Sequence, residues 1–412
     1  MATATLPPPY RRVVAVAGLS NLADGIRMAA FPLLAVSLTN SATLIGIVVV
    51  AGSIPGVVFG LSAGQIVDRV DRRRLLQRVT AARVVLLTVL ALLVLADAVP
   101  ITLLAIAALA LGASEVLADN TTAVLVPVLV PAEDLERANA TMVGVSIVGN
   151  ELAGPAIGGV LFAVGAAVPF LTNAGLLAGV LLLLAGLPLL SPRTESADSA
   201  GSLAAEAPND RRGIVDGLTF VRNSGFLRTT FWTTAALAAI DGAWFSLLVL
   251  FVDVELGYGE GGSSAVAFGL FLAVGALGGL VGVAIADRWP GLPLVGVVTT
   301  VFSSMGLSLI ALGLAPTPAV TTVVLVVTSG GFALWNVVVV SARQRATPPS
   351  MYGRVQAAYR TLVVTAALVG TLAGAVLADI TSIRVSLLSC GVVIALSTPL
   401  AATGFQRHGN AR

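Results

Sequence analysis

The feature that most constrains this chain is a series of twelve apolar runs, each long enough to cross a bilayer. A helix needs about 20 predominantly apolar residues to span the hydrocarbon core. We therefore predict spanning helices at 13–38, 42–67, 75–96, 100–125, 136–163, 167–190, 226–252, 264–286, 292–314, 318–342, 352–378 and 383–405. Only 11% of the 412 residues are charged, against about 25% in soluble domains. The composition therefore excludes an ordinary soluble protein.

The chain also repeats itself at an offset of about 217 residues. Three polar motifs recur in the same order: Asp24-Gly25 as Asp241-Gly242, Asp68-Arg69 as Asp287-Arg288, and Pro131 with Arg137 as Pro348 with Arg354. Two homologous halves are typical of secondary transporters, which bind substrate near the bilayer midplane at the repeat interface. We predict an all-α integral membrane fold with two pseudo-symmetric six-helix halves, 1–190 and 226–412, joined by a linker at 191–225.

Arginine placement predicts the orientation of the spans. The loops on the side of both termini carry most of the arginines, whereas the opposite side has Arg384 among several acids. By the positive-inside rule both termini are cytoplasmic, and we expect a bacterial cytoplasmic (inner) membrane. Within the polar linker, residues 214–224 carry Ile214, Leu218 and Val221 on one face, which predicts a short interfacial helix.

Several kinds of chemistry are excluded by residue types that the chain lacks. All 23 basic residues are arginines, so neither a Walker-A lysine nor a Schiff-base lysine is available. Cys390 is the only cysteine and suits a small buried apolar residue. No metal-ligand cluster, nucleophile triad or nucleotide loop occurs in the sequence. We expect no enzyme activity, no cofactor, no metal and no nucleic-acid partner, and a monomer in contact with lipid.

Ionisable residues at membrane depth carry the chemistry that we expect. Each costs about 2.5–3.5 kcal/mol on insertion scales and is a functional candidate. The predicted cavity residues on spans 1, 4, 5 and 7 are Asp24, Arg27, Glu115, Asp119, Asn150, Glu151 and Asp241. Five acids against one base predict an acidic, partly unpaired cavity. Burial raises the pKa of a carboxyl group and a neighbouring Arg lowers it, so a carboxyl group that alternates between the two environments carries protons.

Each candidate also has a structural interpretation. Asp24 and Arg27 share a helix face and can form a purely structural ion pair. Glu151 can bond to Arg27, and Asp241-Gly242 can serve as a helix break. The aromatic and amide side chains of spans 7 and 10 can contact a ligand or pack in the core: Trp244, Trp335 and Asn336.

Two motifs resemble those of the major facilitator superfamily. Residues 64–74, Gly-Gln-Ile-Val-Asp-Arg-Val-Asp-Arg-Arg-Arg, resemble its G-x-L-A-D-R-x-G-R-R loop between the second and third helices. Residues 154–159, Gly-Pro-Ala-Ile-Gly-Gly, match the G-P-x-x-G-G end of its antiporter motif in the fifth helix. Asp71 at the usual glycine, together with the stretch from Arg343 to Val355, resembles the branch of macrolide-efflux and siderophore-export proteins.

The resemblance implies roles for both motifs. The loop implies a cytoplasmic gate formed by Gly64, Asp68, Arg69, Arg72, Asp287 and Arg288. The alternative for these residues is plain positive-inside topology. The fifth-helix motif implies a tight, bent antiporter helix with Gly154, Pro155, Gly158 and Gly159 on one face, and its alternative is ordinary small-residue packing. The chain departs from the drug-antiporter pattern in span 4, which has Glu115 and Asp119 in place of an arginine, and at Asn150 in place of a glycine.

These expectations converge on a secondary active transporter that exports an amphipathic small molecule, cationic or neutral and lipophilic, by proton antiport and alternating access. The first rival is export of a siderophore or another endogenous metabolite, which needs basic residues in the cavity if the cargo is an anion. A proton-coupled nutrient symporter and a sensor without flux rank lower. Sodium in place of the proton stays open.

Overall fold

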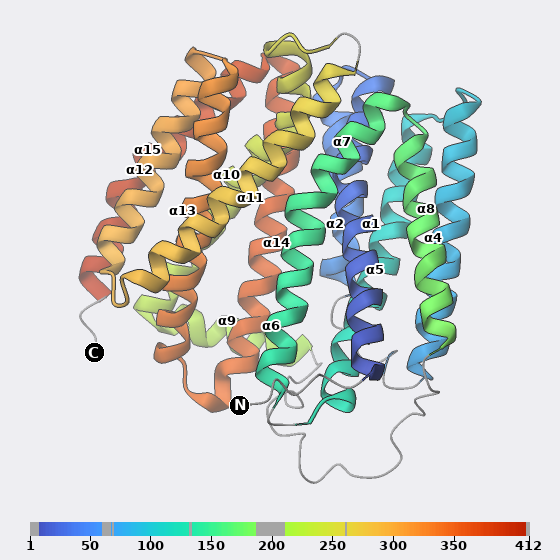
Figure 1. The fold of residues 1–412 in the computed structure, drawn as a ribbon. Coiled ribbons are helices and arrows are strands. Elements are labelled where there is room, and N and C mark those ends of the chain that lie inside the picture. The colour runs from blue at the N-terminus through green and yellow to red at the C-terminus, as the bar shows by residue number, and fades with distance from the viewer. Residues whose placement is uncertain are drawn as a thin grey trace. The chain divides into compact units, whose positions relative to one another are not determined.

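The structure of the chain is a computed structural model that describes residues 8–59, 67, 70–131, 134–186, 211–259 and 262–408. Within these ranges all regular structure is helical (Figure 1). The α-helices are α1 Pro8–Leu38, α2 Ala42–Val58, α4 Arg72–Leu95, α5 Ile101–Leu129, α6 Leu135–Ser146, α7 Gly154–Val164, α8 Val168–Ala185, α9 Arg211–Asn223, α10 Gly225–Leu250, α11 Ser263–Arg288, α12 Leu294–Leu314, α13 Pro318–Ala346, α14 Pro349–Ile380 and α15 Ile383–His408. Two π-helical segments are η2 Ile147–Ala153 and η3 Phe251–Glu255.

The helix lengths confirm the predicted fold class. Among the described residues, 11 helices are long and apolar enough to cross a membrane. The predicted span 136–163 is one such continuous element made of α6, η2 and α7. The predicted span 42–67 contains α2, which is described as 17 residues, and residues 60–66 of that span lie outside the described part of the chain.

The chain divides into two compact units. The first unit contains α1, most of α2, and α4 to α8, and it also takes in Gly257–Ala273, which includes the start of α11. The second unit contains α9, α10, the rest of α11 and α12 to α15, and it takes in Ser41–Gly46 at the start of α2. Each unit therefore includes a short segment from the other half of the sequence.

The helix boundaries show the same repeat as the polar motifs. Adding 217 to the bounds of α1 (8–38) gives 225–255, which are the bounds of α10 with η3. The same offset carries α5 (101–129) onto α13 (318–346). It also carries the start of α6 to within three residues of the start of α14. Residues at this offset therefore occupy matching places in the two units.

In the first unit α1 and the fifth-span helix cross closely because glycines lie at the contact. A Cβ on Gly154 would lie 2.6 Å from the Cα of Gly25, and it would also collide with the carbonyl oxygen of Gly149. A Cβ on Gly158 would lie 2.7 Å from the carbonyl oxygen of Ile26. Small residues let two helix backbones approach in this way. The predicted small-residue face of Gly154, Pro155, Gly158 and Gly159 is buried.

The bend expected at Pro155 takes the form of a π-helical segment. The N–H of Gly154 bonds to the carbonyl of Gly149, five residues earlier, at the end of η2. Pro155 follows in the first turn of α7, where a missing N–H is tolerated. The wider π turn therefore lets the span continue through a residue that cannot donate a hydrogen bond.

The second unit has an equivalent crossing between α10 and α14. A Cβ on Gly242 would collide with the carbonyl oxygen of Ala367. A Cβ on Gly374 would lie 2.8 Å from the Cβ of Ala243. Each unit thus has one such closely packed helix pair, α1 with the fifth span in the first unit and α10 with α14 in the second.

Helix α9 covers most of the segment 214–224, for which we predicted an interfacial helix, and it lies across the start of α14 (Figure 1). Its face differs from the expectation, because Val221 is buried in a cluster with Leu227, Phe231 and Tyr359 whereas Leu218 is exposed. The helix is therefore fixed to its own unit by Val221. The rest of the predicted linker, 191–210, lies outside the described residues.

Candidate functional site

The buried charges of the first unit form a chain of ion pairs. Asp24 on α1 accepts a hydrogen bond from Arg83 on α4. Their exposed fractions are 5% and 2%. Arg27 lies 3.6 Å from Asp24, measured from Nε to Oδ1, and its Nη2 donates to Glu115 on α5. Buried charges are tolerated when each has a partner, so this network ties α1, α4 and α5 together.

Arg83 is the residue that the sequence analysis missed. It lies within the predicted span 75–96, where an arginine at membrane depth is itself a signal of a buried partner. The expected balance of five acids against one base is therefore wrong. Around Asp24 the balance is three acids, Asp24, Glu115 and Asp119, against two bases, Arg27 and Arg83.

Asp119 differs from the other two acids because it has no ion-pair partner among the described residues. It lies one turn beyond Glu115 on α5, within electrostatic range of Asp24, Glu115 and both arginines. Its side chain is exposed and lines a pocket of about 430 Å³. The pocket lies entirely within the first unit, among α1, α4, α5, α8 and the fifth span.

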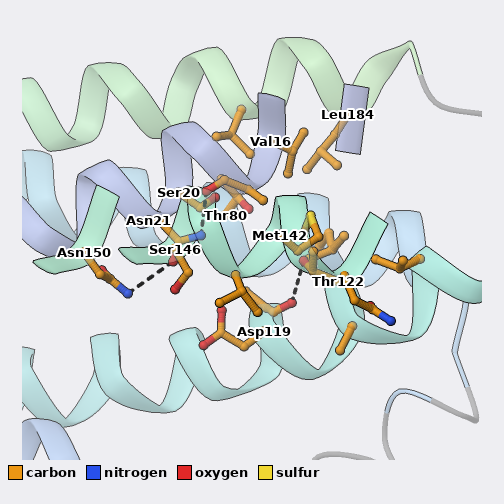
Figure 2. A pocket seen from close by; sticks show the side chains of 18 residues that line it. Val16, Ser20, Asn21, Thr80, Asp119, Thr122, Met142, Ser146, Asn150 and Leu184 are labelled. Carbon is orange, nitrogen blue, oxygen red and sulfur yellow. Dashed lines mark hydrogen bonds between the residues drawn. The ribbon is translucent and has the colours of Figure 1, made fainter. Parts of the chain in front are cut away.

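The two ends of this pocket differ in polarity. Buried apolar side chains form its floor: Val16, Ala17, Leu76, Val180 and Leu184. Hydroxyl and amide groups also belong to the lining: Ser20, Asn21, Thr80, Thr122, Asn139, Ser146 and Asn150. Figure 2 shows Asp119 on the opposite side of the pocket from Val16 and Leu184. The pocket can thus hold a molecule with one apolar and one polar or charged end.

The two predicted residues of η2 point in different directions. Asn150 lines the pocket and donates a hydrogen bond to the side chain of Asn21 at 3.1 Å (Figure 2). Glu151 is exposed, and within the described residues it forms no ion pair with Arg27. Of the adjacent pair, only Asn150 belongs to the pocket.

In the second unit Asp241-Gly242 is the repeat of Asp24-Gly25, and Asp241 has an uncharged partner. Asp241 accepts a hydrogen bond from Nε1 of Trp244 at 3.2 Å. Trp244 stands at the position that Arg27 occupies in the first unit, 217 residues earlier. The indole donor replaces the guanidinium, so Asp241 has a dipolar rather than a charged partner.

Trp335 packs among aromatic side chains of the second unit, as the core alternative given for it in the sequence analysis expects, and Asn336 beside it is half-buried. Trp335 is 1% exposed, and its ring lies 5.6 Å from that of Phe302 and 6.2 Å from that of Phe405, between centroids. Asn336 donates to the carbonyl of Phe332 in its own helix. The apolar interior of the second unit explains why the tryptophan packs there.

Part of the predicted gate lies outside the described residues, namely Gly64, Asp68 and Arg69. Asp71 caps α4 by accepting a hydrogen bond from the N–H of Arg74 at 2.8 Å. Arg72 begins α4 and is partly buried. Asp287 and Arg288 are exposed at the end of α11. The gate assignment therefore stays a prediction.

Among the described residues, no group of three or more His, Cys, Asp or Glu is arranged to hold a metal ion. The fold consists of apolar spanning helices in two repeated units, and the first unit contains charged side chains at membrane depth. This combination defines the architecture of a secondary transporter.

Comparisons with known proteins identify the family. A sequence profile of the Major Facilitator Superfamily matches residues 13–370, and the chain belongs to that superfamily. It is a transporter rather than an enzyme. A search of curated protein sequences finds no significant match.

Solved structures of several transporters have a similar fold. A mutant of the nucleoside transporter NupG is 13% identical, with a TM-score of 0.73 over 97% of this chain and 99% of that one. A bacterial homologue of the human lysosomal transporter Spinster, inward-facing and unoccupied, is 13% identical, with a TM-score of 0.72 over 98% and 99%. A bacterial homologue of the iron transporter ferroportin, inward-facing, is 16% identical, with a TM-score of 0.71 over 98% and 100%. At these identities the likeness shows the fold alone.

Proposed function

We propose that this transporter exports amphipathic small molecules, cationic or neutral and lipophilic, in exchange for protons. The observation that carries the proposal is the buried charge network of the first unit. Asp24, Glu115 and Asp119 supply three carboxylates, and Arg27 and Arg83 supply two guanidinium groups. With every group ionised, the cluster has a net charge of −1.

The excess negative charge belongs to Asp119, which lies beside the carboxylates of Asp24 and Glu115, and one bound proton neutralises this cluster. Asp119 is the member best placed to hold that proton, because Asp24 and Glu115 are already paired with arginines. A bound cation would neutralise the cluster equally well. Proton and cationic substrate are therefore alternative occupants, which is the basic requirement for antiport.

The direction of transport is supported by the fifth-span motif. Gly154 and Gly158 pack so closely against α1 that an added Cβ would collide with its backbone. The motif that contains them, residues 154–159, resembles the fifth-helix motif of antiporters in this superfamily. A close helix contact limits leakage of protons along the transport path. The resemblance to macrolide-efflux proteins favours a drug-like, lipophilic cargo. We place the transporter in a bacterial cytoplasmic membrane with both termini on the arginine-rich, cytoplasmic side.

Export of an anionic siderophore ranks second for an electrostatic reason. An anion needs a base that is free to bind it. In the described part of the chain, Arg27 and Arg83 both pair with carboxylates, and Arg343 donates to Gln356 and lies over the ring of Tyr359. The buried bases are thus already engaged.

The proposal is tested by reconstitution in liposomes with an imposed pH gradient, acidic on the side that corresponds to the outside. Movement of lipophilic cations, neutral macrolides and siderophores is followed, with a sodium gradient as the control. We expect the pH gradient to drive cation movement in the wild type and to have no effect in Asp119→Asn. Cation movement that follows only the sodium gradient, or siderophore movement alone, would contradict the proposal.

A further inference from the structure

Larger side chains stand in the second unit at positions that match three residues of the pocket lining. The offset of 217 places Trp335 at the position of Ala118, Arg343 at that of Val126 and Tyr359 at that of Met142. Ala118, Val126 and Met142 all line the pocket. The repeat alone therefore does not require a pocket here.

The three larger residues are packed within the second unit, Trp335 among other aromatic rings and Arg343 against Tyr359. Nε1 of Trp335 donates to the hydroxyl oxygen of Thr234 at 3.3 Å. The guanidinium of Arg343 lies 4.1 Å above the ring of Tyr359 and donates to Gln356 at 2.6 Å. Trp335 and Tyr359 are each 1% exposed. This fold can thus fill the same space with side chains, so the opening in the first unit is a property of its particular residues.

The size and lining of the opening suit a ligand. A volume of about 430 Å³ falls in the range of roughly 300–1,000 Å³ that is typical of small-molecule sites. Such sites combine apolar walls with a few polar groups that fix orientation. Here Val16, Leu76 and Leu184 supply the apolar floor, and Asp119 lies among the exposed residues of the lining.

We propose that this pocket, lined by residues of the first unit, is the binding site for the substrate: the apolar group lies on the floor and the positive charge lies beside Asp119. The inference deepens the proposed function and rests on it for the identity of the cargo. It adds that one unit supplies the whole site, whereas transporters of this architecture generally bind substrate at the interface of their repeats.

The charges that face Asp119 determine how proton and substrate compete for it. Glu115 on the same helix and Asp24 on α1 favour a positive occupant, and Arg27 and Arg83 oppose it. Helix α8 has no ionisable residue. On the fifth span, Glu136, Arg137 and Glu151 are exposed and outside the pocket lining. Cation binding should therefore weaken as the pH falls, because a proton on Asp119 removes the charge that attracts the cation.

The experiment measures equilibrium binding to the purified full chain in detergent, without any gradient. The probes are naphthylethyl-trimethylammonium, which has a permanent charge, and naphthylethanol, its neutral counterpart. We expect Asp119→Asn to weaken binding of the ammonium roughly tenfold. This factor corresponds to an ion-pair energy between the value in water and the value near a protein surface. Binding of the alcohol should be unchanged by this substitution.

The pocket itself is tested by replacing one of its lining residues with the residue at the matching position of the second unit. In Ala118→Trp the indole should fill the space and abolish binding of both probes. The matched control is Ala110→Trp, an exposed position two turns earlier on α5 that does not line the pocket. Thermal melting checks the fold of each variant. Met142→Tyr, the milder substitution from the same comparison, provides the test if Ala118→Trp does not fold.

The outcomes separate the site from the transport function. Wild-type affinity for the ammonium in both Ala118→Trp and Met142→Tyr would overturn the site, even if liposomes showed proton-driven export. No binding of the ammonium to the wild type would overturn the assigned ligand class. Binding that is lost in Ala118→Trp, in a protein whose transport ignores the pH gradient, would support the site and reject proton antiport.

Discussion

Asp24 and Asp241 stand at the same place in the two repeats, yet their surroundings differ. Asp24 pairs with Arg83 and lies beside Arg27, whereas Asp241 accepts one hydrogen bond from the indole of Trp244. The backbone around them is alike, because Gly25 and Gly242 each touch a carbonyl of the fifth helix of their own unit. Helix α12 is the counterpart of α4 in the second unit, and it has no charged residue. The fold is thus repeated, whereas among the described residues the linked ion pairs around this aspartate occur in the first unit.

The difference teaches that one unit is suited to handling charge and the other to packing. In the first unit the cluster around Asp24 has three acids and two bases, and its Asp119 lines an open pocket. The second unit has the larger, buried side chains Trp335, Arg343 and Tyr359 at positions that match the pocket lining. The predictions below test this division, starting with the largest expected effect.

Breaking the buried pair should have the largest effect. Arg83→Leu removes the hydrogen-bonded partner of the buried Asp24 and leaves it only Arg27, which Glu115 shares. We expect a loss of roughly 3–5 kcal/mol in the free energy of unfolding. Thermal and denaturant unfolding in detergent measure this loss. Asp24→Asn combined with Arg83→Leu removes both charges and should recover much of the stability. If Arg83→Leu alone unfolds like the wild type, the pair does not organise the first unit.

The glycine crossings should respond alike in the two units. Gly25→Ala places a methyl group against Gly149 and Gly154, and Gly242→Ala places one against Ala367. We expect each to lose roughly 1–3 kcal/mol, as overpacking in a tight contact does. Gly144→Ala is the control, because its added methyl would meet nothing within 4 Å. A loss for only one of the two crossings would show that the units do not share this contact.

The two aspartates should differ in their effect on coupling. Asp241→Asn keeps an oxygen that accepts the hydrogen bond of Trp244 and breaks no ion pair in the described part of the second unit. We expect stability within about 1 kcal/mol of the wild type and an unchanged dependence of transport on pH. Initial rates of efflux over a pH series measure this dependence. A shifted pH profile in Asp241→Asn would give the second unit a share of proton handling.

The smallest effect should come from the exposed ion pair of the second unit. Arg354 and Asp216 are 3.1 Å apart, with side chains 36% and 54% exposed. Water screens such pairs, so Asp216→Asn should change the free energy of unfolding by roughly 0–1 kcal/mol. Unfolding at low and high salt checks this value. A loss as large as that of Arg83→Leu would remove the distinction between buried and exposed pairs.

Much of the fold could be predicted from the sequence. Apolar length located the spans, because a bilayer sets the length of a helix that crosses it. Repeated motifs such as Asp24-Gly25 located the two halves, and the helix boundaries repeat at the same offset. The closeness of Asp24 and Arg27 followed from their spacing of three residues on one helix.

The rest depends on how helices pack, which spacing along one helix does not reveal. Arg83 meets Asp24 across 59 residues of sequence and Arg27 meets Glu115 across 88. The pocket is lined by helices from most of the first unit, and small residues such as Ala118 belong to its lining. Trp335 was a reasonable cavity candidate by type, but Phe302 and Phe405 enclose it.

The central claim is that the cluster of the first unit exchanges one proton for one cation at Asp119. Proton release on adding naphthylethyl-trimethylammonium to purified protein, in weakly buffered detergent solution at the pH of half-maximal binding, tests it most directly. We predict that the wild type and Asp241→Asn release less than one proton per bound cation. This number should rise toward about one as the pH falls, because a single carboxyl group exchanges a proton for the cation. Asp119→Asn should release none. Undiminished release from Asp119→Asn, or loss of release in Asp241→Asn alone, would contradict the account.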